Sequence, residues 1–191
     1  TYQEDRLRND WLLLLGQRRD WSQFAEQHPS YRMSDDREVR CYALLIDHIK
    51  GTAPATVADD VRSNWYAIRD ADDGCTHAAR ELYGYKKLSA LDVWRKARLG
   101  VEANRPRVVR SAVEIVSPES LPQLKDVLDA PSKYLLSRAT AAGKARQELI
   151  VLALLKLATS DPDGAARQLD SKWSVHLSPE ERNWAWGVIG K

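Results

Sequence analysis

The sequence is poor in the residues that usually carry metal or covalent chemistry. Its 191 residues include only two cysteines, Cys41 and Cys75, and four histidines. The histidines are scattered and no C-x-x-C pair occurs, whereas a structural zinc site needs about four clustered ligands. The sequence therefore predicts neither a metal nor another cofactor.

Long apolar runs are also absent. The longest, Leu149 to Leu155, is far shorter than the roughly 18 residues that a membrane-spanning helix needs, so we expect no transmembrane segment. The chain begins at Thr1, without a methionine and without a charged-then-apolar leader. This start predicts a processed protein or a piece of a longer one.

The charge balance argues against a nucleic-acid partner. Lys and Arg number 29 against 27 Asp and Glu, which leaves a net charge of +2, and both signs are interspersed along the chain. The densest basic run is "RPRVVR", from Arg105 to Arg110. We favour a solvated helix face for this run over a polyanion site.

The familiar catalytic motifs are missing, including Gly-x-Ser-x-Gly, His-Glu-x-x-His and the glycine-rich phosphate loops. One stretch, "KARQELIV", places Glu148 after Arg-Gln and so imitates the catalytic acid motif of lytic transglycosylases. We expect Glu148 in the first turn of a core helix, where the helix dipole lowers the pKa of a carboxyl, the wrong direction for a general acid. The sequence therefore predicts no catalytic residue, and a stand-alone enzyme is the weakest of three functional hypotheses.

Almost every segment carries a helical pattern, and strand signals are nearly absent. The pattern predicts an all-α fold of ten to twelve helices, each of 10–18 residues, joined by short loops. Such helices must stack on their neighbours to bury their apolar stripes. We therefore expect a degenerate helical-repeat solenoid, an α-superhelix, rather than a compact bundle.

Several helix boundaries and buried faces follow from local signals. Asp35 or Asp36 is expected to cap a helix that ends at Gly51, and a proline follows a capping residue at Ser117, Asp161 and Ser178. Two apolar stripes are predicted: Cys41, Tyr42, Leu45 and Ile49 on one helix, and Val57, Val61, Trp65 and Ile68 on the next. The segment from 148 to 157 is apolar nearly all round, which predicts a helix enclosed on several sides. The residues alone leave two alternatives for the cysteines, two buried thiols or a disulfide between neighbouring helices.

Three stretches together resemble the N-terminal helical region of the large periplasmic soluble lytic murein transglycosylases. They are "VRCYALLIDHIKG", "DDGCTHAARELYG" and "LSALDVWRKARLGVEANRPRVVRSAV", and the opening "LRNDWLLLLGQRRDW" is similar to an early helix pair of that family. The matching positions include Cys41-Tyr42-Ala43, Cys75, Leu88-Ser89-Ala90, Val93-Trp94, Arg98-Leu99 and Glu102-Ala103-Asn104. These are mostly helix-packing residues rather than catalytic ones. In that family a ring-forming α-superhelix precedes a lysozyme-like catalytic domain.

The resemblance implies a disulfide between Cys41 and Cys75 and a location in the periplasm of a Gram-negative bacterium. It also implies that residues 1–191 form one superhelical segment of a longer protein, without the catalytic domain. The segment would act as a non-catalytic scaffold that shapes the approach of murein glycan strands. The parent enzyme would cleave the bond between N-acetylmuramic acid and N-acetylglucosamine and form a 1,6-anhydro product.

On this interpretation the partner is the peptidoglycan glycan strand. Five arginines are candidates to meet the carboxylates of its peptide stems: Arg95, Arg98, Arg105, Arg107 and Arg110. The alternative hypothesis is an independent α-solenoid that binds another protein. The apolar end of the chain, residues 183–191, is expected to favour self-association.

Overall fold

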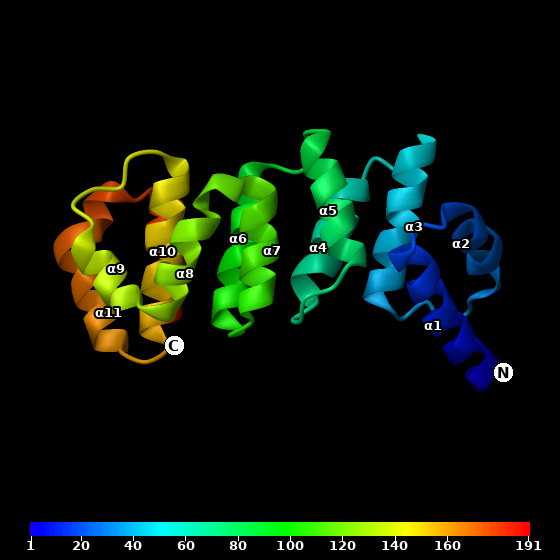
Figure 1. Ribbon diagram of the computed structural model, residues 1–191, viewed down its shortest axis with the longest axis horizontal. Coiled ribbons are helices and arrows are strands. Elements are labelled where there is room, and N and C mark those ends of the chain that lie inside the picture. The colour runs from blue at the N-terminus through cyan, green and yellow to red at the C-terminus, as the bar shows by residue number, and fades with distance from the viewer. The chain divides into compact units, whose positions relative to one another are not determined.

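The computed structural model describes all residues from 1 to 191, and every regular element in it is helical (Figure 1). The prediction of an all-α protein with ten to twelve helices is confirmed: there are twelve α-helices and no strand. None of these helices combines the length and the apolar character that crossing a bilayer requires. Contacts between helices divide the chain into two compact units, Thr1–Asp92 and Val93–Lys191.

The first unit contains α1 (Tyr2–Gln17), α2 (Trp21–Gln27), α3 (Arg37–Lys50), α4 (Val57–Ala67) and α5 (Gly74–Gly84). The start of α6 (Ala90–Glu102) belongs to the first unit and its remainder to the second. The second unit continues with α7 (Pro106–Val116), α8 (Leu121–Asp129), α9 (Pro131–Ser137), α10 (Lys144–Ala158), α11 (Pro162–Gln168) and α12 (Pro179–Ile189). Short 3-10 and π turns connect several of them.

Most of the predicted helix ends are confirmed by capping contacts. The Asp36 side chain accepts a hydrogen bond from the Val39 amide at 3.0 Å, and α3 ends at Gly51 in the left-handed conformation. The side chains of Asp161 and Ser178 cap α11 and α12 in the same manner. Ser117 differs, because a 3-10 turn at Pro118–Ser120 precedes α8.

Two details of the prediction were wrong. Four helices, α2, α8, α9 and α11, have only seven to nine residues and fall short of the predicted minimum of ten. In α3, Ile49 is 54% exposed, and the buried residue is Ile46. The reason is that the α3 stripe turns toward α1, where Ile46 joins a buried cluster with Leu12 and Leu15.

The core of the first unit is built around the ring of Tyr42 on α3. Gly16 of α1 lies against this ring, so closely that a side chain at position 16 would collide with it. Phe24 of α2 meets the same ring edge-on, with the ring centroids 6.0 Å apart. The Tyr42 hydroxyl donates a 2.6 Å hydrogen bond to Asp73, at the start of α5. One aromatic side chain therefore connects four of the five helices.

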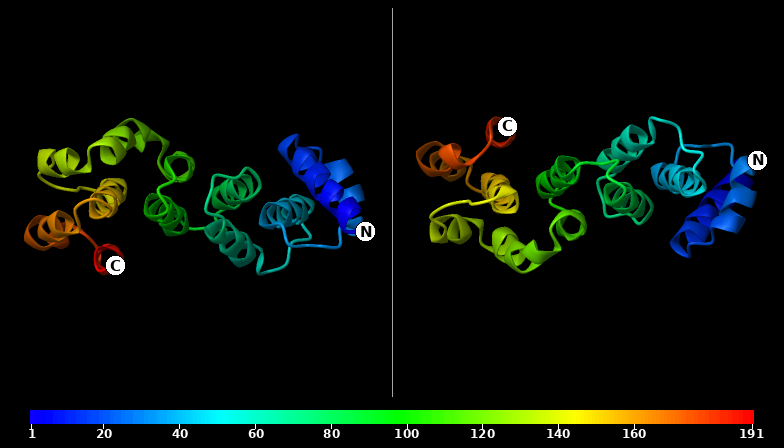
Figure 2. Two further views of the ribbon diagram at one scale, coloured as in Figure 1. Left: turned by 90° about the horizontal axis from the view of Figure 1, so that it is seen from below. Right: turned by 90° about the horizontal axis from the view of Figure 1, so that it is seen from above.

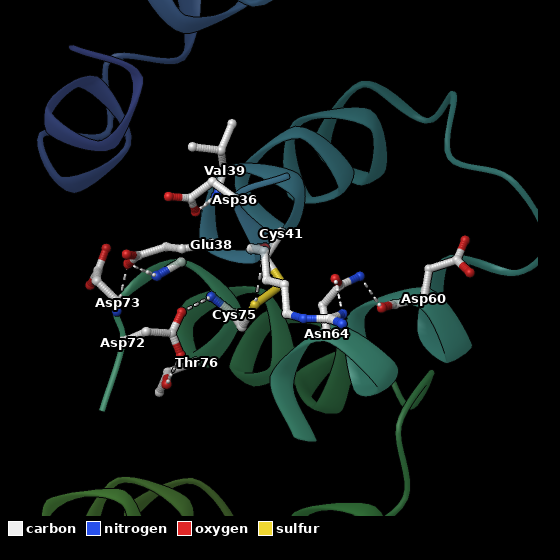
Figure 3. Close-up of a disulfide and its surroundings, with 12 residues drawn as sticks. Asp36, Glu38, Val39, Cys41, Asp60, Asn64, Asp72, Asp73, Cys75 and Thr76 are labelled. Atoms are coloured by element: carbon white, nitrogen blue, oxygen red, sulfur yellow. Dashed lines mark hydrogen bonds between the residues drawn. A yellow bond between two sulfur atoms is a disulfide. The ribbon is translucent and has the colours of Figure 1, made fainter. Parts of the chain in front are cut away.

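A disulfide joins Cys41 of α3 to Cys75 of α5, as the resemblance implied (Figure 3). Both cysteines are fully buried. Beside them, one carboxylate oxygen of Glu38 accepts hydrogen bonds from the amides of Asp73 and Gly74, at 2.9 and 2.8 Å. Because these amides lie at the start of α5, Glu38 satisfies groups that the helix itself leaves unpaired. The covalent bond and the Glu38 contact thus attach the same end of α5 to α3.

The environment of Asp73 predicts that a fall in pH lowers the free energy of unfolding of the first unit. Burial acts to raise the pKa of this carboxyl, but hydrogen bonds from Arg19 and Tyr42 outweigh burial and hold the pKa below its ordinary 3.8. A carboxyl with a lowered pKa stabilises the fold above the unfolded-state value, and this contribution disappears as the pH falls through the folded-state pKa. In urea denaturation, we expect Asp73→Asn to reduce the loss of unfolding free energy between about pH 7 and about pH 3.

The matched control is Asp10→Asn, which neutralises an exposed carboxyl on α1. This variant should lose as much stability on acidification as the unchanged protein. An equal loss in all three proteins would contradict the role of Asp73.

In the second unit α10 is the central helix, as its apolar sequence predicted. It packs against α8, α9, α11 and α12, and Figure 2 shows it end-on in yellow between these neighbours. Every side chain from Glu148 to Leu155 is buried. Glu148 is therefore the one charged group in this buried stretch of α10, and a buried charge needs a partner.

Candidate functional site

The partner of Glu148 is Arg98, which α6 brings to α10 from 50 positions away in the sequence. The guanidinium binds Glu148 through two parallel hydrogen bonds, with its Nη2 at 2.6 Å from Oε1 and its Nε at 3.1 Å from Oε2. It also binds Glu180 of α12 through Nη1 and Nη2, at 2.6 and 2.9 Å. Arg98 and Glu148 have no exposed surface. One arginine therefore ties three helices of the second unit together inside its core.

Other charges, some of them partly exposed, complete the group around Arg98 and Glu148, which we call the Arg98 cluster. Lys144 Nζ lies 3.6 Å from Glu148 and 3.3 Å from Glu181, and Arg95 Nε lies 3.3 Å from Glu180. The Trp184 ring stacks under the Arg98 guanidinium, 5.0 Å from its centroid. The Arg98 cluster thus contains three basic and three acidic side chains.

Electrostatics distinguish the two carboxylates that Arg98 binds. Burial raises the pKa of Glu148, and Arg98 offsets this effect only in part. For Glu180 the burial is weaker, so Arg98 and Arg95 hold its pKa below the ordinary value. The predicted lowering of the Glu148 pKa was therefore wrong. Glu148 lies beyond the first turn of α10, and burial outweighs the helix dipole there.

A raised pKa is a property of general acids, but the geometry at Glu148 is not that of one. Both carboxylate oxygens are bonded to Arg98, and the side chain is 0% exposed. A general acid must come within hydrogen-bond reach of the group that it protonates. The contacts of Glu148 are those of a residue that holds helices together.

The structure separates the five candidate arginines into two groups. Arg95 and Arg98 belong to the Arg98 cluster, and the full burial of Arg98 excludes it from contact with a ligand at the surface. Arg105, Arg107 and Arg110 line a groove at the other end of α6. This groove, which we call the basic groove, is the candidate binding site of the second unit.

The turn from α6 to α7 builds one wall of the basic groove. Asn104 has a positive φ of 55°, and the Asn104 and Arg105 amides donate to the carbonyls of Val101 and Gly100. Pro106 then starts α7 at the first helical position. Gly100 allows α7 to approach closely, since a Cβ there would lie 2.9 Å from Val108 and Val109.

The floor of the basic groove is apolar and its rim is basic. Its volume is about 370 Å³, with Val101, Val109, Leu124 and Leu128 among the floor residues. Five basic side chains line it, Arg105, Arg107, Arg110, Lys125 and Lys156, together with one acidic side chain, Asp129. No aromatic side chain lines it. The volume lies within the range of about 300–1,000 Å³ that is usual for small-ligand sites.

The charges around the basic groove are not balanced. Asp129 is bound to Lys125 at 2.9 Å, and Lys156 donates to the Asn104 side chain at 3.3 Å. Arg107 and Arg110 are exposed and have no acidic partner. The basic groove therefore presents positive charge to an incoming ligand. The described residues contain no group of three or more His, Cys, Asp or Glu side chains that could hold a metal ion.

The whole chain superposes on 31% of lytic transglycosylase Slt from Pseudomonas aeruginosa, of which an inactive mutant has been solved by X-ray crystallography. The TM-score is 0.66 and the sequence identity is 22%. The chain has a lytic transglycosylase-like helical fold. It spans about a third of the length of that protein. No protein-family model and no curated protein matches the sequence.

The resemblance inferred from the sequence is thus confirmed for the fold. The Arg98 cluster was not predicted from the sequence, although two of its members, Arg95 and Arg98, were predicted as ligand contacts. One signal was available: a glutamate next to a buried apolar run requires a cation beside it. The sequence does not say which of the many basic residues supplies it.

Proposed function

We propose that this chain is a non-catalytic helical segment of a soluble peptidoglycan lytic transglycosylase. In the parent enzyme it shapes the approach of murein glycan strands to a separate C-terminal catalytic domain. That domain cleaves the bond between N-acetylmuramic acid and N-acetylglucosamine and forms the 1,6-anhydro product. One observation carries the proposal: all of this chain matches the fold of Slt, yet it covers only 31% of that protein.

The Arg98 cluster supports the non-catalytic part of the proposal. Glycoside cleavage requires a carboxylic acid next to the scissile bond and commonly a second group that stabilises the oxocarbenium-like transition state. Glu148 imitates the acid motif in sequence, but its oxygens are bound by Arg98 inside the core. In a helical scaffold, a glutamate bound in this way holds neighbouring helices together.

The disulfide supports an oxidising compartment, which we propose to be the periplasm of a Gram-negative bacterium. Cys41 and Cys75 are both buried and bonded to each other. Disulfides persist in oxidising compartments such as the periplasm and are rare in the cytosol. Peptidoglycan lies in the same compartment, so the bond and the proposed partner are consistent.

The proposal predicts that the 191-residue chain binds the cell wall without cutting it. We expect the purified chain to co-sediment with isolated sacculi and to release no soluble 1,6-anhydro muropeptides, as measured by mass spectrometry of the supernatant. Chitin, which lacks the lactyl ether and the peptide stems, serves as the control polymer and should retain much less protein. An active lytic transglycosylase added to the same sacculi verifies that product is detectable.

Two outcomes would overturn the proposal. Release of 1,6-anhydro products by the chain alone would make this segment an enzyme, and Glu148→Gln would then be the next variant to assay. Failure to co-sediment with sacculi would favour the alternative, an α-solenoid that binds another protein.

A further inference from the structure

The basic groove contains two arginines whose charge the protein does not use. Arg107 and Arg110 lie three positions apart on α7, so their side chains project from the same face of the helix. Neither has an acidic partner, and both line the basic groove. A pair of guanidiniums on adjacent turns is suited to hold carboxylates through two parallel hydrogen bonds.

The position of Arg107 at the start of α7 is unfavourable for the helix itself. Pro106 is the first helical residue, so Arg107 lies in the first turn of α7 and Arg110 in the second. The helix dipole is positive at this end and favours acidic side chains there. The arginines and the dipole therefore add to one another, and together they favour an anion in the basic groove.

The other lining residues restrict the kind of anion. Nucleobases bind by stacking on aromatic side chains, and sugar rings commonly bind in the same manner, but no aromatic residue lines the basic groove. Its floor consists of aliphatic side chains, including Val109 and Leu124. Methyl groups fit such a floor. The complementary ligand is a short peptide with free carboxylates and small apolar side chains.

We infer that the basic groove binds the peptide stem of peptidoglycan, with stem carboxylates on Arg107 and Arg110 and alanine methyl groups on the aliphatic floor. This inference rests on the proposed function, because that function supplies the polymer. It specifies which part of the polymer the chain recognises, namely the peptide stem rather than the sugar chain. The scaffold would then select strands whose stems are intact.

The test is isothermal titration of the 191-residue chain with the free tetrapeptide L-Ala-γ-D-Glu-meso-diaminopimelate-D-Ala. We expect binding at low ionic strength that weakens as salt is added. The double variant Arg107→Gln/Arg110→Gln should bind at least about tenfold more weakly, because each lost charge-assisted hydrogen bond is worth about a factor of ten or more. A tetrapeptide with amidated carboxyl groups should bind the unchanged protein as weakly as the acid form binds the variant.

The matched control is Arg80→Gln/Arg167→Gln, which removes the same charge from exposed positions on α5 and α11, outside the basic groove. An equal weakening in both double variants would mean that net charge, not the basic groove, attracts the peptide, and would overturn the inference. Unchanged affinity in Arg107→Gln/Arg110→Gln would also overturn it. Circular dichroism melting verifies that both variants remain folded.

The sacculus experiment separates failure of this inference from failure of the proposed function. If sacculi are bound but the tetrapeptide is not, the chain recognises the wall elsewhere: the inference fails and the scaffold function holds. If neither is bound, both fail. Binding of both, with loss of both in Arg107→Gln/Arg110→Gln, supports the two together.

Discussion

Replacing Arg98 by methionine is expected to lower the free energy of unfolding by about 3–5 kcal/mol, the usual cost of removing one partner from a buried ion pair. Methionine occupies a similar volume but leaves Glu148 buried without the guanidinium that binds both of its oxygens. Glu180 is less affected, since 31% of its side chain is exposed to solvent and Arg95 remains beside it. Urea denaturation followed by circular dichroism measures the change.

The same variant should show a characteristic pH dependence. Burial already raises the pKa of Glu148 in the presence of Arg98, and without Arg98 the pKa rises further. A protonated carboxyl is neutral and costs less to bury, so the destabilisation should shrink as the pH falls below this raised pKa. The loss of stability in Arg98→Met is therefore expected to be smaller in mildly acidic buffer than at neutral pH.

A second substitution tests the cause. Arg98→Met combined with Glu148→Leu removes both members of the ion pair and should recover much of the lost stability, because an apolar pair of similar volume often replaces a buried ion pair without cost. Arg146→Met on the exposed surface of α10 is the control and should change the unfolding free energy by less than about 0.5 kcal/mol. A similarly small effect of Arg98→Met would show that Lys144 alone compensates Glu148.

Removing the disulfide with Cys41→Ser/Cys75→Ser is the second change with a large expected effect. The bond closes a loop with a sequence separation of 34 residues, and the chain-entropy relation gives a loss of roughly 3–4 kcal/mol for a loop of this length. The first unit carries the bond between α3 and α5, so its unfolding should shift and that of the second unit should not. Hydrogen exchange read by mass spectrometry distinguishes the two units.

Intact mass after alkylation provides the control for this experiment. Protein purified from an oxidising compartment should take up no alkylating reagent before reduction and two equivalents after it. The reduced wild-type protein should then match the serine variant in stability. Free thiols before reduction would contradict the bond, and equal stability of the oxidised and reduced forms would contradict its energetic role.

Local features of this fold could be predicted because their causes lie within a few residues of each other. Asp36 and Gly51 bound α3, and Ser178 with Pro179 starts α12, through contacts inside one or two turns. The enclosed position of α10 followed from its unbroken apolar run from Leu149 to Leu155. The residues alone left open whether Cys41 and Cys75 form a disulfide. The family resemblance implied the bond.

Tertiary structure alone decided the roles of the charged residues. Glu148 follows Arg98 by 50 positions in the sequence, and Glu180 follows it by 82. No local sequence pattern brings these residues together. Tertiary packing also decides between Ile46 and Ile49, which are equally apolar. Only Ile46 faces α1 and is buried. A buried arginine and an exposed arginine on a helix cannot be distinguished in the sequence, because both occur at helical spacing. Burial and partners distinguish them, and these properties arise only when distant helices pack.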